Sequence, residues 1–139
     1  MTVSSDDPGQ ATQEAIVAAL KAELVDSSPN RATGIYDGVA PPGTPAPYVT
    51  FGDENTVPLN FLVAVKEDRF IQCGVWSTAR GKHEIRAIFK GFYRALHNKR
   101  LPLSEGNMVV CQVERTRITR DADDVTFMGS VTLRVMTEH

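Results

Sequence analysis

The stretch KHEIRAIFKGFYRALHN, residues 82–98, carries the clearest structural signal in the chain. Its apolar side chains recur at i, i+3, i+4, i+7 and i+11, which is the spacing of one face of an α-helix. The pattern predicts an amphipathic helix whose apolar face packs on a core. We expect Ser77 or Thr78 to cap its N-terminus, and the helix to end near residues 97–98. The predicted apolar face consists of Ile85, Ile88, Phe89, Phe92 and Leu96.

Strand-like runs lie on both sides of this helix. Residues 68–77, DRFIQCGVWS, carry apolar side chains on both faces, which indicates a strand in the middle of a sheet. Residues 107–119 and 125–138 form two further runs, separated by a short polar segment. Apolar and polar side chains alternate in the last run, with Gly129 on the apolar side. These two runs predict a long C-terminal β-hairpin.

A first helix is predicted over residues 8–25. Asp7 offers an N-cap and Pro8 a first helical position. Small residues form a stripe on each predicted helix, and such stripes let two helix axes come close. Alanine is also a good helix former, so the sequence leaves both explanations open. The stripes are Ala11, Ala15, Ala18 and Ala22 on the first helix and Ala87, Gly91 and Ala95 on the second.

The segment between the first helix and residue 68 is rich in proline. Residues 40–47, APPGTPAP, predict a stiff, extended lead-in to a strand at residues 47–52. We interpret residues 53–67 as an excursion between two strands that is in part β-structure. Pro58 argues against a central strand there, because proline donates no backbone hydrogen bond.

The order of these elements is helix, strand, strand, helix, strand, strand. This order predicts an α+β fold in which an antiparallel or mixed sheet of four to five strands carries two helices on one face. The length of 139 residues suits a single domain, residues 1–139, in which we expect residues 1–6 to be flexible.

The composition is that of a globular protein. Hydrophobic residues make up 42% of the chain and the net charge is −2, which favours neither disorder nor a strongly basic nucleic-acid binder. The sequence has no apolar run of about 18 residues and no signal-peptide pattern, so we expect a cytoplasmic protein without a membrane span. Cys73 and Cys111 lie in apolar runs, which favours buried free thiols and leaves a disulfide open.

Motifs for catalysis and metal binding are incomplete. His83 and Glu84 begin an H-E-x-x-H motif, but Ala87 stands where its second histidine is needed. His83 and His97 fall at opposite ends of the predicted helix, too far apart to bind one metal ion. We therefore expect no enzyme activity, no cofactor and no metal site.

Positive charge is concentrated around the second predicted helix. Residues 79–100 carry a net charge of about +6, which leaves about −8 for the rest of the chain. The stripe suits three roles: a phosphate-binding surface, a solvated helix flank, or a contact with an acidic surface of another copy or partner. The charge split fits the third role better than it fits DNA binding. At steps of four residues the stripe contains Lys82, Arg86, Lys90 and Arg94.

The order of motifs along the chain resembles that of a known family. The motifs are IYDGV (35–39), APYVTFGD (46–53), FIQCGVWS (70–77), the second helix, and a final hairpin that ends LRVMTE (133–138). Over roughly residues 11–138 they resemble the tail-completion, or tail-terminator, proteins of long-tailed bacteriophages and gene transfer agents. None of these motifs is catalytic.

The resemblance implies a structural role in a virion. Proteins of this family form a ring, usually of six copies, that caps the tail tube, ends its elongation and joins it to the head-side connector. DNA passes through the central hole without being read. The implied partners are further copies, the tail-tube protein and the connector, with no cofactor and no membrane. The implied location is the head-proximal end of the tail, after assembly in the host cytoplasm. The alternative function is a small nucleic-acid-binding module that uses the basic stripe.

Two groups of residues are the predicted contacts of such a ring. The excursion includes VPLNFLVAV (57–65), which is more apolar than expected for this family and would be exposed in a lone copy. We predict that it contacts an adjacent subunit or the tail tube; the alternative is that it folds back onto its own core. The predicted interface residues are Leu59, Phe61, Leu62 and Val63 in the excursion and Arg86, Lys90 and Arg94 in the basic stripe.

Overall fold

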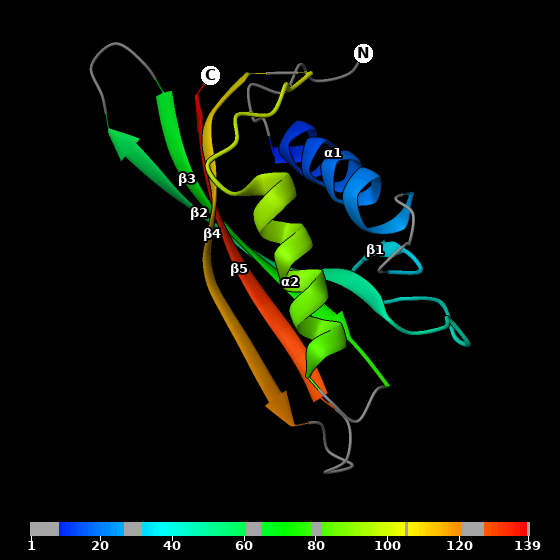
Figure 1. Ribbon diagram of the computed structural model, residues 1–139. Helices are drawn as coiled ribbons and strands as arrows, with labels where there is room; N and C mark the ends of the chain where they lie inside the picture. The colour runs from blue at the N-terminus through cyan, green and yellow to red at the C-terminus, as the bar shows by residue number, and fades with distance from the viewer. Residues whose placement is uncertain are drawn as a thin grey trace.

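The computed structural model describes residues 9–26, 32–60, 65–78, 82–104, 106–120 and 127–138 (Figure 1). Both predicted helices are present; the first matches its expected bounds within one residue, and the second ends where expected but begins later than its predicted cap implied. The helical elements are α1 (Gly9–Leu20), the short π-helical turn η1 that continues it (Lys21–Val25), and α2 (His83–Leu96). The strands are β1 (Ile35–Asp37), β2 (Tyr48–Asn60), β3 (Val65–Trp76), β4 (Asn107–Arg120) and β5 (Phe127–Glu138).

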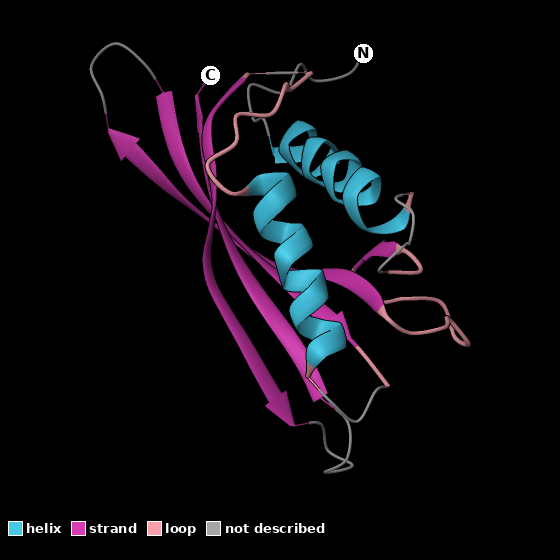
Figure 2. Cartoon of the chain, viewed as in Figure 1, coloured by secondary structure: helices cyan, strands magenta, loops and turns pink. Residues whose placement is uncertain are grey.

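The strands form one mixed sheet in the order β1-β2-β3-β5-β4. β1 runs parallel to β2, and the other neighbouring strands are antiparallel. Both helices lie on the same face of this sheet (Figure 2). The predicted α+β class, the placement of the helices and the C-terminal hairpin β4–β5 are therefore confirmed.

The core fills the layer between the helices and the sheet. All five side chains of the apolar face predicted for α2 are buried. Gly129 of β5 lies beneath this face, as its place on the apolar side of the strand predicted. A Cβ atom at Gly129 would lie 2.7 Å from Cγ2 of Ile85 and 2.9 Å from Cζ of Phe89. The glycine therefore lets α2 approach the sheet more closely than any other residue would.

The two helices also come close to each other at a glycine. A Cβ atom at Gly91 of α2 would collide with Cδ2 of Leu24, which is fully buried in η1. Ala18 and Ala22 are exposed. The close contact is therefore made by Gly91 against a leucine, and the alanine stripe of the first helix has no part in it at these two positions.

The predicted cap of α2 is wrong. The helix begins after Lys82, and no side chain forms a hydrogen bond that caps it. Ser77 lies too far ahead of the helix start for an N-cap, because five residues separate it from His83. Its hydroxyl instead donates a hydrogen bond of 2.6 Å to Oε1 of Glu84 in the first turn.

The described residues of the predicted excursion, 53–60 and 65–67, form the outer part of the long hairpin of β2 and β3. β2 and β3 stay paired from Glu54 with Ile71 to Asn60 with Val65, and this hairpin extends past the helices (Figure 1). β1 pairs with β2 only as far as Phe51, so at Pro58 the side of β2 that faces away from β3 is an edge of the sheet. An edge strand tolerates proline because no neighbouring strand needs its missing amide hydrogen. The inference that Pro58 excludes a central strand is correct, and the excursion is more regular than predicted.

The proline-rich lead-in is a folded loop rather than a straight arm. The amide of Thr44 donates a hydrogen bond to the carbonyl of Pro41. Gly43 has a φ of 81° at the third position of this turn, which favours glycine. The hydroxyl of Thr33 binds the carbonyls of Pro45 and Pro47 at 2.6 and 3.1 Å. The prediction of an extended segment was wrong because it counted the prolines and overlooked the turn that Pro42 and Gly43 form together.

Candidate assembly surfaces

A basic groove of about 520 Å³ runs between α2 and the edge strand β4. Three of the predicted cations, Lys82, Arg86 and Lys90, line its α2 side, and Arg117 lines its β4 side. All four residues are exposed, and none forms an ion pair with a residue that the structure describes. The groove therefore offers positive charge that a partner can neutralise. Its other lining residues are Phe89, Tyr93, Thr116 and Ile118.

Arg94, the fourth residue of the predicted stripe, does not line this groove. Each step of four residues turns a side chain by about 40° around the helix axis, so Arg94 is about 120° away from Lys82. Its Nη1 atom lies 3.9 Å from Oε1 of Glu23 in η1. The stripe therefore divides: three cations line the groove, and Arg94 faces the contact between the helices.

Phe127, the first residue of β5, extends the basic surface from α2 to the end of β4. The Nζ atom of Lys82 lies 5.4 Å from the centre of its ring, and Cζ of Arg120 lies 5.3 Å from it. Both are cation–π distances. Arg117 and Arg120 were not among the residues predicted from the sequence, although three arginines at residues 115, 117 and 120, within and just after the strand predicted over residues 107–119, were a visible signal.

The second predicted contact lies on the β2–β3 hairpin. Leu59 is half-buried near the end of β2, and Val57 on the same strand is 47% exposed. Phe61, Leu62 and Val63 lie outside the residues that the structure describes. The contact of this segment with a neighbour therefore stays a prediction.

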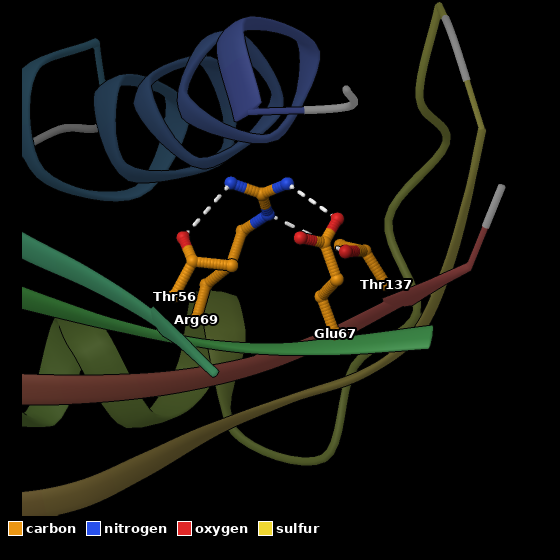
Figure 3. Close-up of polar contacts among 4 residues, drawn as sticks. All are labelled: Thr56, Glu67, Arg69 and Thr137. Carbon is orange, nitrogen blue, oxygen red and sulfur yellow. Dashed lines mark hydrogen bonds and ion pairs between the residues drawn. The ribbon is translucent and has the colours of Figure 1, made fainter. Parts of the chain in front are cut away.

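A buried arginine anchors the base of this hairpin (Figure 3). Arg69 of β3 is only 3% exposed, and its side chain rises from the sheet towards α1. Its guanidinium donates hydrogen bonds to the hydroxyls of Thr56 in β2 and Thr137 in β5, both at 3.4 Å. It also forms an ion pair of 3.2 Å with Glu67. One side chain therefore links three neighbouring strands, β2, β3 and β5, in the outer half of the β2–β3 hairpin.

A second charged pair holds the opposite face of the same strand. Nη2 of Arg134 in β5 donates a hydrogen bond of 2.8 Å to Oδ2 of Asp68. This hydrogen bond, together with the negative charge of Asp68, raises the pKa of Arg134. Neither pair was predicted from the sequence. The signal for the first was present, because Glu67 and Arg69 are opposite charges two residues apart and so share one face of a strand.

Comparison with known protein families gives one match that covers most of the chain. The model of the family described as "Tail completion protein gp17" matches residues 14–138. The chain belongs to the tail completion protein gp17 family. It is thus a structural protein of a virion tail, as the resemblance implied. A search of curated proteins gave no match to the sequence.

The fold of this tail completion protein is also found in a solved structure. A chain in the structure described as "Virion of native gene transfer agent (GTA) particle" superimposes with a TM-score of 0.83. The match covers 97% of this chain and 100% of that chain, at 23% sequence identity. At this identity the likeness establishes the shared fold.

His97, a titratable residue outside the two surfaces, has a structural partner in the tail completion fold. Nδ1 of His97 accepts a hydrogen bond of 3.1 Å from the amide of Val113, which ties the end of α2 to β4. Within the described ranges, no group of three or more His, Cys, Asp or Glu side chains is arranged to hold a metal ion. None of the described helices has the length and apolar character of a membrane span.

The two cysteines are free and buried, so we predict that neither thiol reacts in the folded protein. Burial raises the pKa of Cys111 to about 12, and burial together with the charge of Cys111 raises that of Cys73. The reactive thiolate is therefore scarce at pH 8. A colorimetric disulfide reagent should label neither cysteine in buffer and both in urea. Rapid labelling without urea would contradict this burial.

Because the pKa values of both thiols are raised in the folded protein, burial of the neutral thiols should contribute its full stabilisation near pH 7. This contribution to the free energy of unfolding should be lost as the pH rises towards 12.

Proposed function

We propose that this chain is the tail terminator of its particle. In this proposal a ring of copies, six in number, caps the last ring of the tail tube and ends its elongation. The ring also provides the joint to the head-side connector, and DNA passes through its lumen without sequence-specific contacts. The observation that carries the proposal is the family match over residues 14–138. The role is structural, with no catalytic step.

The two surfaces of the isolated chain support self-assembly. The β2–β3 hairpin carries the exposed Val57 and the half-buried Leu59, and residues 61–64, which follow Asn60 in the sequence, are all apolar. We propose that Leu59, Phe61, Leu62 and Val63 contact an adjacent copy or the tail tube. Arg86 and Lys90 lie in a groove with unneutralised charge, which suits an acidic partner. Arg94 already pairs with Glu23, so its contribution to such a contact is the smallest of the three.

The head-proximal end of the tail is the site of this ring, reached after assembly in the host cytoplasm. A terminator needs two faces, one for the tail tube and one for the connector, and a ring supplies both with a single kind of subunit. Its partners are then further copies, the tail-tube protein and the connector protein.

Nucleic-acid binding through the basic groove is the second candidate function. The observation in its favour is the set of three α2 cations next to Tyr93, which is 43% exposed and offers a ring for stacking. The groove lies beside buried Phe89 and a strand edge, and exposed aromatic rings are otherwise lacking from its described lining. An acidic protein surface therefore fits better than a nucleic acid strand.

Deleting the gene for this chain should leave particles with tails of uncontrolled length or with heads and tails unjoined. Without a cap, tube subunits continue to add, and the connector has no surface to bind. Electron microscopy of lysates gives the distribution of tail lengths and the fraction of joined particles. A plasmid copy of the wild-type gene is the control and should restore both. Tails of uniform length joined to heads in the deletion strain would refute the proposal.

A further inference from the structure

The two edges of the sheet are each covered along only half of their length. At the β4 edge, residues 97–101 cover the first half: the carbonyl of Lys99 accepts a hydrogen bond from Cys111, and the side chain of Arg100 binds the carbonyl of Met108. Beyond Val113, which His97 binds, no described backbone segment pairs with the outer side of β4. Residues 114–120 therefore form an open edge.

The opposite edge shows the same arrangement. β1 pairs with residues 49–51 of β2, and the amide of Gly38 adds one hydrogen bond to the carbonyl of Phe51. From residue 52 to residue 60 the outer side of β2 has no backbone partner among the described residues. Each open stretch begins at a register shift, between Phe51 and Glu54 in β2 and between Val113 and Arg115 in β4.

The strand registers place the two open stretches at diagonally opposite corners of the sheet. Thr116 of β4 pairs with Val131 of β5, and Val131 pairs with Cys73 of β3. Cys73 in turn pairs with Phe51 of β2, so Thr116 and Phe51 are level across the sheet. The open half of β4 is therefore level with the covered half of β2. In the same way, the covered half of β4 is level with the open half of β2. A copy can meet one neighbour through each corner without the two contacts overlapping.

The two corners carry opposite charge. Residues 32–65 contain no Lys or Arg. Their three acidic residues are exposed: Asp53 and Glu54 lie where the open stretch of β2 begins, and Asp37 ends β1 opposite Phe51. We call this group the acidic corner. None of the three has an ion pair within the described part of the chain. The β4 corner combines the cations of the groove with those of the open strand. Its basic residues are Lys82, Arg86, Lys90, Arg115, Arg117 and Arg120.

We propose that adjacent copies in the ring meet through these corners, so that the basic corner of one copy receives the acidic corner of the next. This inference rests on the proposed ring and adds the surfaces that form it. Two different, complementary surfaces on one chain give a head-to-tail contact, which is the kind that closes into a ring. The contact is made mainly by side chains, because the register shifts and Pro58 disfavour continuous pairing of the two edges.

Charge reversal at each corner tests the proposal. The basic-corner variant is Arg86→Glu with Lys90→Glu, and the acidic-corner variant is Asp53→Lys with Glu54→Lys. Like charges that face each other across an interface repel, so each variant should assemble at least about tenfold more weakly than wild type. The measurement is sedimentation velocity at moderate salt, for the full chain alone and with tail-tube protein. The matched control, Lys21→Glu with Lys99→Glu, changes the charge equally at two exposed positions outside both corners and should assemble as wild type does.

Mixing the two corner variants gives the sharper result. In an equimolar mixture each reversed corner meets a reversed partner, so copies alternate and rings with an even number of subunits should form again. A chain that carries all four substitutions should also assemble. Failure of the mixture and of the fourfold variant would overturn the head-to-tail contact.

The outcomes separate this inference from the proposed function. Wild-type chain that stays monomeric with and without tail-tube protein would refute the ring itself. Rings that form equally well from wild type and from both corner variants would leave the terminator role standing and overturn the corner contact. Normal assembly of the basic-corner variant with loss of salt-sensitive binding to a DNA duplex would instead assign the groove to nucleic acid.

Discussion

Replacing Arg69 by Ala is expected to lower the free energy of unfolding by about 3 kcal/mol. The side chain of Glu67 is only 17% exposed, and the substitution would leave its carboxylate without the guanidinium. Thr56 and Thr137 would each lose a hydrogen bond, and the removed side chain would leave a cavity beneath α1. Urea unfolding followed by circular dichroism measures the loss. Hydrogen exchange should quicken most in the outer halves of β2 and β3, because Arg69 links them to β5.

Lys66→Ala is the matched control for this prediction. Lys66 lies on the same strand and pairs with Glu138 of β5 at 3.7 Å, but both side chains are about one-third exposed. Exposed ion pairs contribute about 0–1 kcal/mol, so the control should lose less than about 1 kcal/mol. The double variant Glu67→Gln with Arg69→Met should recover part of the loss, because it removes both charges. Equal losses for Arg69→Ala and Lys66→Ala would show that the buried cluster does not anchor the hairpin.

Periodicity predicted the parts of the fold that depend on burial of one face. The five apolar positions of α2 and the alternation of β5 each follow from a repeating contact with the core, and a repeat is visible in the sequence. The cap of α2 and the course of residues 40–47 depend on single local hydrogen bonds, those of Ser77 and Thr33 among them. Such bonds leave no repeat, and this is why both predictions were wrong.

The candidate surfaces were predictable in charge but not in position. The stripe of α2 cations was visible, yet only the tertiary fold shows that Arg94 turns to Glu23 and that Arg117 completes the groove. The acidic corner was hidden for another reason. Asp37 lies in β1 and the other two acids follow the proline-rich loop, and the pairing of β1 with β2 is what brings these segments together. Sequence reasoning cannot place two segments side by side without the strand order.

Replacing Gly129 by Ala is expected to lower the free energy of unfolding by about 2 kcal/mol, because α2 rests on this residue. The new Cβ atom would lie 2.7 Å from Cγ2 of Ile85 and 2.9 Å from Cζ of Phe89, both in buried side chains. Either α2 shifts away from β5 or both side chains leave their preferred rotamers. For a chain of this size the loss corresponds to a fall in Tm of about 6 °C by calorimetry.

Gly52→Ala controls for the backbone effect of the same substitution in a strand. A Cβ atom at Gly52 would meet only the carbonyl oxygen of Gln72, at an ordinary 3.6 Å. Alanine restricts the unfolded chain more than glycine does, so Gly52→Ala should leave the Tm unchanged or raise it slightly. Changes in Tm of opposite sign for the two substitutions would locate the effect of Gly129→Ala in the contact between α2 and β5. A Gly129→Ala variant as stable as Gly52→Ala would show that this contact can accommodate a methyl group, and that other contacts hold the helix layer to the sheet.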